Sequence, residues 1–407
     1  MKKTIYKYLN FWLLINSFLW GVGEAGAIFL LISPSPAING VGGSGVSTST
    51  MDIYSSHYNP AQTKLPDGLS VQFSNYKTSW LPNLNSDLTL QYNVQMFGYN
   101  GFSLLDKYLV QLSITSLNTH LDLGESNILF ETISGWNSYM SSKAMTYSLG
   151  ISSDKYPIYL GFGKTFKKVE QILKNGSDIE TSNNEFQDWG IKFVIDNYKL
   201  KNIQNLGINY SFGYSKSNIG DPVRFGNQVD LPPTNSRLGM TLGMEYIFYK
   251  NLGINFTLVR EAEELMVENI VNESVSAGYE SIYKDGYVEN ISIKNHIIDG
   301  IAEEDVIIHN GYEITLFDCI YIRDGKYVDI EGYIEVDTDG FGIDLGGVLK
   351  VGSYLIDSPS LRDMKLLKYI NLHYNLSNYN AETGHPLDNI SFDELTVTIK
   401  NIEKLFY

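Results

Sequence analysis

The sequence has few charged side chains, a single cysteine and no apolar run long enough to cross a membrane, and each shortage excludes a class of protein. Charged residues make up 19% of the 407 residues, below the roughly 25% of an average soluble protein. The single cysteine, Cys319, excludes an internal disulfide framework and a cysteine-based zinc site. The 46 acidic and 30 basic residues give a net charge of −16, so we expect no binding to nucleic acid.

Motifs that carry chemistry are missing as well. The six histidines form no HxxxH or HxH pair, so no histidine-based metal site is expected. There is no nucleophile elbow, phosphate loop or dinucleotide-binding fingerprint. We therefore expect a protein that is not an enzyme, without catalytic residues, cofactor or metal. What is abundant is tyrosine and glycine, with 29 and 36 residues, and this composition favours β structure.

The N-terminus has the three parts of an export signal. Lys2, Lys3 and Lys7 are positively charged, residues 11–20 are apolar, and residues 21–25 offer a cleavage site. We predict a signal peptide over residues 1–25. No later run approaches the roughly 20 apolar residues of a transmembrane helix. The exported chain is therefore either soluble outside the cytoplasm or inserted in a membrane as a β-barrel.

Alternation of apolar and polar residues recurs along most of the chain. From Leu206 to Ser215, Leu, Ile, Tyr and Phe alternate with Gly, Asn and Ser. The same pattern returns in residues 88–96, 110–115, 145–151, 238–248, 252–258 and 370–376. An apolar face opposite a polar, mostly uncharged face suits a strand with lipid outside and a water-lined lumen inside. A soluble β-sandwich or propeller would also alternate, because one strand face packs on its core.

The connections between these strands favour the barrel. Counting strands from residue 69, the connections after the second, fourth, sixth and eighth strands are short, at residues 100–108, 153–156, 197–205 and 250–251. Those after the odd-numbered strands are long and polar, at residues 118–144, 166–188, 216–237 and from 261 onward. Short periplasmic turns that alternate with long extracellular loops are typical of outer-membrane barrels. We therefore place the protein in the cell outer membrane.

Nearly all of the net charge lies in residues 261–337, which hold nineteen acidic and four basic residues. Strand parity makes the start of this stretch an extracellular loop. It is either a solvated hydrophilic loop or a docking surface for a basic partner or divalent cations. Residues 328–336 alternate again, which predicts a further strand with Asp324 and Gly325 as its hairpin turn. Two strands from residues 270–337 would complete a total of about 14.

The segment after the signal carries the most specific pattern. Its motifs, in order, are Phe29-Leu30-Leu31-Ile32, Pro34, Gly40-Val41-Gly42, Gly45-Val46-Ser47-Thr48-Ser49, Asp52 and Tyr58-Asn59-Pro60-Ala61. They resemble the start of the PorV/PorQ family of outer-membrane proteins, relatives of the FadL-type fatty-acid transporters, and are closest to PorV of the type IX secretion system. The sequence departs from the family pattern at Ala37, Val41 and Tyr58, where Arg, Met and Trp are usual. Beyond residue 100 only the alternation of strands matches.

The resemblance implies an all-β, FadL-like transmembrane barrel of about 14 antiparallel strands over residues 67–407. It also implies an N-terminal plug over residues 26–66. The plug residues carried over from the family pattern are Phe29, Leu30, Ile32, Gly40, Gly42, Asn59, Pro60 and Ala61. Glycine permits the sharp turns of such a segment and Pro60 keeps Asn59 extended. The alternative for this segment is an unstructured linker between signal and barrel.

The resemblance also implies a function and partners. A PorV-like protein is a non-enzymatic carrier that sits beside the translocon barrel of the type IX system. It binds secreted proteins through their C-terminal signal domains and delivers them to the surface attachment complex. Trp80, Leu81 and Pro82 resemble part of the family's first loop and are the predicted partner-binding loop, because exposed apolar side chains need a partner or a lipid. Trp80 could equally anchor the chain in outer-membrane lipid.

Two other functions stay open. A FadL-like outer-membrane transporter of hydrophobic small molecules would use the plug as a gate and would need apolar residues inside the barrel. The inward faces that the sequence suggests are Gly, Ser, Thr, Asn and Gln, which bind a fatty acid poorly. A purely structural, porin-like barrel is the third possibility.

Overall fold

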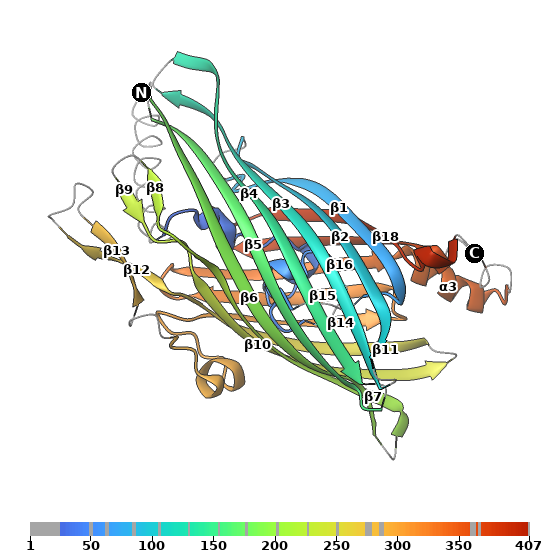
Figure 1. Ribbon diagram of the computed structural model, residues 1–407. Helices are drawn as coiled ribbons and strands as arrows, with labels where there is room; N and C mark the ends of the chain where they lie inside the picture. The colour runs from blue at the N-terminus through green and yellow to red at the C-terminus, as the bar shows by residue number, and fades with distance from the viewer. Residues whose placement is uncertain are drawn as a thin grey trace.

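The computed structural model describes residues 25–405, with gaps at 49–51, 62–64, 84–86, 105–106, 129–130, 154, 176–177, 201–202, 226–227, 250–251, 273–278, 285–288, 359–363 and 365–367. Fourteen antiparallel strands close into one barrel (Figure 1). They are β1 (Gly68–Ser79), β2 (Thr89–Leu104), β3 (Tyr108–Ile128), β4 (Glu131–Ser153), β5 (Ile158–Asn175), β6 (Asp178–Leu200), β7 (Ile203–Gly220), β10 (Asn235–Tyr249), β11 (Leu252–Leu265), β14 (Ile307–Leu316), β15 (Ile320–Asp329), β16 (Ile334–Asp344), β17 (Ile370–Ala381) and β18 (Ile390–Ile399). The predicted fold class is therefore confirmed. The predicted signal peptide, apart from Ala25, lies outside the described residues.

The two ends of the barrel carry different connections. We call one end of the barrel the outer end; it carries the hairpins β8–β9 (Val223–Phe225 and Gln228–Asp230) and β12–β13 (Val267–Val271 and Tyr279–Tyr283), with the π-helix η4 (Ile293–Ile298), and the opposite end is the inner end. At the inner end lie the short turns, the helix α3 (Leu345–Leu355) and the C-terminal η5 (Ile402–Leu405). No described helix is long and apolar enough to cross a bilayer.

Two segments predicted to be long polar loops are mostly strand. Within residues 118–144, β3 and β4 stay paired to Ile128 and Glu131, and within residues 166–188, β5 and β6 stay paired to Asn175 and Asp178. The loop prediction was wrong because these strands continue past the apolar band of the wall. Outward side chains there are polar, so polarity did not mark a loop.

The acidic stretch 261–337 also contributes strands to the wall. It supplies the end of β11, all of β14 and β15, and the first residues of β16. Asp324 and Gly325 lie inside β15, opposite Tyr312 and Gly311 of β14, so the predicted hairpin turn is wrong. The alternation of residues 328–336 spans the end of β15, a turn and the start of β16. Gly325 is needed because a Cβ there would collide with the backbone at Val41.

The apolar face of the wall changes sides along β2. Near the inner end, Phe97 and Tyr99 point outward and are 51% and 37% exposed. Nearer the outer end, Leu90, Tyr92 and Val94 point into the barrel and are almost fully buried. The apolar face of residues 88–96 therefore faces the lumen, and its expected orientation toward lipid is wrong. The pattern repeats every two residues in both halves, but its phase shifts between Met96 and Phe97.

The barrel closes along a short ladder. β1 and β18 pair only through residues 71–74 and 396–399, whereas β1 and β2 pair along all of residues 68–79. Above the short ladder, side chains bridge the seam instead. The Thr78 hydroxyl donates to the Ser391 carbonyl (2.6 Å), and the Ser74 hydroxyl donates to Glu394 (3.1 Å). The β1–β18 seam is thus held by fewer backbone hydrogen bonds than β1 makes with β2.

Candidate functional site

The N-terminal segment lies inside the barrel. It forms two short helical turns, η1 (Ile28–Leu31) and α2 (Pro36–Asn39), and a third, η2 (Ser55–His57). α2 begins at a proline and is capped by Ser35, whose hydroxyl accepts from the Ile38 amide (3.1 Å). Of the predicted plug residues, Ile32 is half-buried and the others are buried: Phe29, Leu30, Gly40, Gly42, Asn59, Pro60 and Ala61.

Inward-facing glycines of the wall make room for this plug. A Cβ built on Gly163 would lie 2.0 Å from the Pro60 oxygen, and one on Gly213 would lie 2.1 Å from the Val46 oxygen. A Cβ on the wall glycines 161, 190, 239, 311 and 325 would also lie within 2.6 Å of a plug atom, and one on Gly340 would lie 3.0 Å from the Gly40 Cα. Any larger side chain at these positions would occupy space that plug atoms fill. These wall glycines therefore leave room for the plug and do not line an open lumen. We call them the glycine seats.

The Asn59-Pro60-Ala61 motif is fixed on both sides. The Asn59 amide donates to the carbonyls of Val46 (2.9 Å) and Ile191 (3.0 Å), and its side-chain oxygen accepts from the Ala61 amide (2.9 Å). The Ser148 hydroxyl of β4 donates to the Pro60 carbonyl (2.6 Å). Asn59 thus closes a turn within the plug and joins two plug segments to the wall, which explains why an amide side chain is needed here.

A buried ionic cluster holds the middle of the plug. Arg237 of β10 pairs with Glu261 (2.8 Å) and Glu263 (2.6 Å) of β11. Glu261 also accepts from the backbone amides of Gly45 (2.6 Å) and Val46 (2.8 Å). All three charged side chains are at least nine-tenths buried. Glu261 and Glu263 begin the stretch that was expected to start as an extracellular loop, and instead they face the lumen.

Further wall residues repeat this arrangement around the lumen. The Nδ1 atom of His309 lies 2.7 Å from the Gly42 oxygen, and its Nε2 atom lies 3.1 Å from Glu263. Lys192 donates to the Thr48 carbonyl, and Arg323 donates to Glu313 (2.7 Å) and Asn375 (2.9 Å). The sequence interpretation missed these inward charges. Their signal was present, because Arg237, Glu261 and Glu263 occupy the inward phase of alternating strands.

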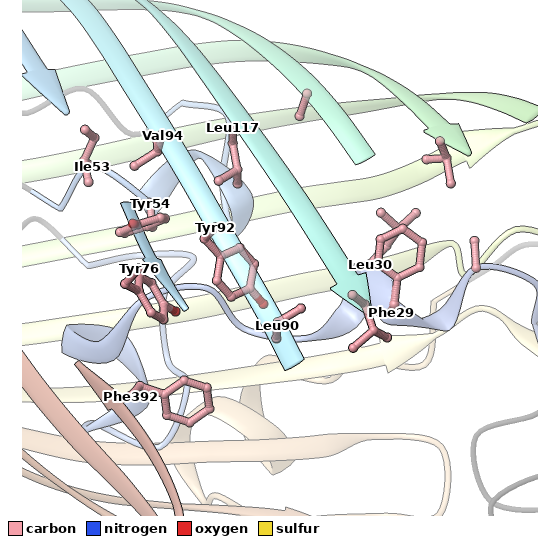
Figure 2. Packing of buried hydrophobic residues seen from close by; sticks show 14 of the residues in the cluster. Phe29, Leu30, Ile53, Tyr54, Tyr76, Leu90, Tyr92, Val94, Leu117 and Phe392 are labelled. Carbon is pink, nitrogen blue, oxygen red and sulfur yellow. The ribbon is translucent and has the colours of Figure 1, made fainter. Parts of the chain in front are cut away.

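Tyrosines of the wall anchor the outer half of the plug. Tyr76 donates to the Pro34 carbonyl (2.7 Å), Tyr92 to the Ile32 carbonyl (3.3 Å) and Tyr379 to the Asn39 side chain (3.1 Å). Figure 2 shows plug Tyr54 beside Tyr76 and Tyr92. The centroid of the Tyr54 ring lies 5.8 Å from that of Tyr76 and 6.3 Å from that of Tyr92, and both pairs meet edge to face. This aromatic cluster is filled by side chains and lies between the plug and β1–β4, β17 and β18.

The predicted partner-binding loop covers this aromatic cluster. Leu81 is only 6% exposed, so its predicted exposure is wrong. Trp80 and Pro82 are half-buried, and the Trp80 ring lies 6.5 Å from the Phe392 ring. The apolar groups of Trp80 and Leu81 are therefore partly or wholly used in packing.

Beneath the plug, toward the inner end, lies a cavity of about 870 Å³ that is lined mainly by polar residues. Its lining includes Asp52 of the plug and Glu313, Arg323, His373 and Glu394 of the wall. Burial raises the pKa of the Asp52 carboxyl, and hydrogen bonds from Ser35 and the Tyr54 amide oppose that shift. Among the described residues, no three His, Cys, Asp or Glu side chains gather closely enough to hold a metal ion.

No family model matches the sequence, and no curated protein matches it. Solved structures with a similar shape include the toluene transporter TodX of Pseudomonas putida, with 10% identity and a TM-score of 0.39 over 90% of this chain and 97% of TodX. A FadL homologue of Pseudomonas aeruginosa has 9% identity and a TM-score of 0.40, over 90% of this chain and 98% of its own. The β-domain of the Bordetella autotransporter BrkA has 10% identity and a TM-score of 0.36, over 82% and 98%. Similarity this distant leaves the function to be inferred from the geometry of the chain itself.

Proposed function

We propose that the protein is an outer-membrane carrier that handles its cargo at its wall and outer surface, while the plug keeps the lumen closed. The observation that carries this proposal is the bond network of Glu261, which ties Gly45 and Val46 of the plug to Arg237 of the wall. Moving the plug would remove the two hydrogen bonds that the Gly45 and Val46 amides donate to this buried carboxylate, which is costly. A free path through the lumen is therefore not the resting state.

Conductance in planar bilayers tests the closed lumen. We expect no steady current through the wild-type protein. A chain that lacks residues 26–61 is expected to conduct, because the glycine seats and the polar inner wall would then border water. Steady current through the wild type at low voltage would overturn the proposal.

Hydrophobic small molecules are the cargo class that the wall favours. The aromatic cluster around Tyr54, Tyr76 and Phe392 borders the β1–β18 seam, where backbone pairing stops after residue 74. A hydrophobic molecule that parts the seam above this point would meet aromatic side chains rather than the polar cavity. The cluster is filled, so entry requires Trp80 or Phe392 to move.

A cross-seam disulfide tests this route. Cysteines at Ser79 and Ser391, which are both exposed on the outside of the wall and which the β1–β18 register would place opposite each other, would staple the seam in a Cys319→Ser background. A matched staple at Asn75 and Asn93 would join β1 and β2, which are already fully paired there. Uptake of a labelled fatty acid should fall with the first staple, recover with reductant and be unaffected by the second. Equal uptake with both staples would reject the seam as a route.

Exported proteins are the second cargo class, as the PorV/PorQ resemblance implies. The residues that carry the resemblance lie between Phe29 and Ala61, and the described residues of this range, 29–48 and 52–61, lie inside the barrel here. A closed barrel of this kind suits a protein carrier that works through its surface. Affinity capture from gently solubilised outer membranes tests this proposal. Recovery of a very large barrel with proteins that share a C-terminal domain supports it, and recovery of lipid or fatty acid alone rejects it.

A further inference from the structure

One outer segment, residues 289–302, lies against the outside of the barrel. We call it the outer strap. Side chains of β11 alternate between the lumen and the outside. Since Glu261 and Glu263 contact the plug or its neighbours, Arg260 and Ala262 face outward. The strap contacts this outward face, and Figure 1 shows its helix η4 in orange outside the wall beside β10.

Glu289 fixes the first end of the strap. Its carboxylate accepts from Tyr214 (2.7 Å), Lys216 (3.0 Å) and Ser236 (3.0 Å), which belong to the neighbouring strands β7 and β10. The next residue, Asn290, donates its backbone amide to Glu264 of β11 (2.7 Å). Two successive residues of the strap therefore contact three neighbouring strands of the wall, β7, β10 and β11.

Arg260 fixes the other end. Its guanidinium donates to the carbonyls of Ile298 (2.7 Å) and Ile297 (3.3 Å) at the end of η4, and to the Asn310 side chain of β14 (2.5 Å). Gly300, at φ +70°, lets the chain turn directly over this guanidinium, since a Cβ would lie 2.7 Å from it. The carbonyls of a helix C-terminus are a favourable partner for a cation.

The strap has one buried and one exposed apolar side. Ile297 is 2% exposed and packs with Leu238, Ala262 and Ile308 on the wall. By contrast, Ile293, Ile298 and Ile301 are 55%, 62% and 51% exposed. Three isoleucines exposed together on one short element are unusual for a surface that faces water.

The exposed isoleucines continue the lipid-facing band. Leu258 and Leu242, which are 46% and 43% exposed, are the next outward residues below Arg260 and Met240 on β11 and β10. One such step along a strand is roughly 7 Å, so the strap ends where the band begins. We infer that the outer strap is a lipid-binding element, with Ile293, Ile298 and Ile301 in contact with the acyl chains of the outer leaflet.

The charges of the strap suit this position. Lys294 and Asp299 pair on its exposed side (2.8 Å), and the polar docking groups are turned toward the wall. An amphipathic element in the interface places apolar side chains among the acyl chains and keeps its charges at the headgroups. The strap would thereby widen the lipid contact of the barrel over β7, β10, β11 and β14.

Spin labelling in lipid vesicles tests the inference. A nitroxide at Ile298→Cys, in a Cys319→Ser background, is compared with labels at Leu258 in the band and at Tyr333, which is 93% exposed in an outer turn. We expect the label at 298 to be relaxed by oxygen rather than by a water-soluble nickel complex, as at Leu258. The ratio of the two accessibilities should exceed that at Tyr333 several-fold. A label at 298 that behaves like the one at Tyr333 would show that the strap faces water, and it would overturn the inference. The same result is expected if the three isoleucines serve to bind a protein instead of lipid.

A second measurement leaves Cys319 in place. Tryptophan at position 298 should be quenched by phospholipids brominated along their acyl chains, whereas tryptophan at Lys294 should be quenched much less. Equal, weak quenching at both positions rejects acyl-chain contact. Because pure lipid vesicles contain no cargo, neither result depends on the proposed carrier function.

Discussion

The wall of the barrel has two parts: an inner belt, nearer the inner end and including Phe97, and an outer half, which includes Val94. Both alternate every two residues, but the apolar side chains point outward in the belt and inward in the outer half. In the inner belt, Phe97, Ile114 and Tyr147 point outward and are 45–51% exposed, while Ser113 and Ser148 point inward and are buried. In the outer half, outward positions such as Gln95 are polar, and inward positions such as Val94 are apolar.

The difference shows what each half is surrounded by. The belt faces lipid and encloses polar groups, as expected for a membrane barrel. The outer half faces water and encloses an apolar core made jointly by wall and plug, as in a soluble sandwich. The plug therefore supplies the apolar core beside β1–β4, β17 and β18, and it meets other strands through the wall glycines and the Arg237 cluster. Four changes test this division.

The largest effect is expected from breaking the buried ionic cluster of Arg237, Glu261 and Glu263. Arg237→Met would leave Glu261 and Glu263 buried without their cation, which costs about 3–5 kcal/mol. The plug should loosen and the barrel should conduct. Lys168→Met is the control, because the Lys168–Glu185 pair is about 80% exposed and contributes little. Urea unfolding and bilayer conductance check both, and equal effects of the two changes would contradict the central role of the cluster.

Filling a glycine seat should have the next largest effect. Gly163→Ala places a methyl group 2.0 Å from the Pro60 oxygen, and overpacking of this kind costs about 3 kcal/mol. Gly352→Ala in α3 is the matched control, since no atom lies within 4 Å of its Cβ. Alanine there should stabilise the helix by up to about 1 kcal/mol. Thermal unfolding distinguishes the two, and a harmless Gly163→Ala would show that the plug can shift.

The belt was predictable from the sequence and the outer half was not. The alternation in residues 206–215 and 238–248 predicted two strands and the faces that they turn to lipid, because lipid outside the barrel fixes which face is apolar. Counting such segments predicted about fourteen strands. Residues 88–96 follow the same period, but a sequence does not tell lipid from an internal core. The orientation at Tyr92 depends on the plug, which is distant in the chain.

The candidate site was predictable in its residues and not in its contacts. The plug motifs pointed to Asn59 and Gly40, yet their partners Gly190 and Gly340 were visible only as small residues on strand faces. Glu261 was misplaced because a run of acidic residues looks solvated, and its cation, Arg237, lies on the neighbouring strand. Charge balance across strands appears only after their register is known.

A polar group inside the outer half should have a moderate effect. Val94→Asn buries an amide in the aromatic cluster without a partner, which costs about 2 kcal/mol. Asn93→Val, the neighbouring outward position, is the control and should change stability by less than about 0.5 kcal/mol. Unfolding in urea measures both changes. If Asn93→Val were the more harmful of the two, the apolar face of the outer half would point outward after all.

The smallest effect is expected where the strap joins the outer half. Burial alone would raise the pKa of Glu289, but hydrogen bonds from Tyr214, Lys216 and Ser236 outweigh it and lower the pKa below the ordinary 4.5. A lowered pKa stabilises docking above the ordinary value, and this stabilisation is lost as the pH falls through the lowered pKa. A nitroxide at position 298 should therefore become more mobile only in strongly acidic buffer. Glu289→Gln should remove this step, and a step that persists in that variant would contradict the assignment to Glu289.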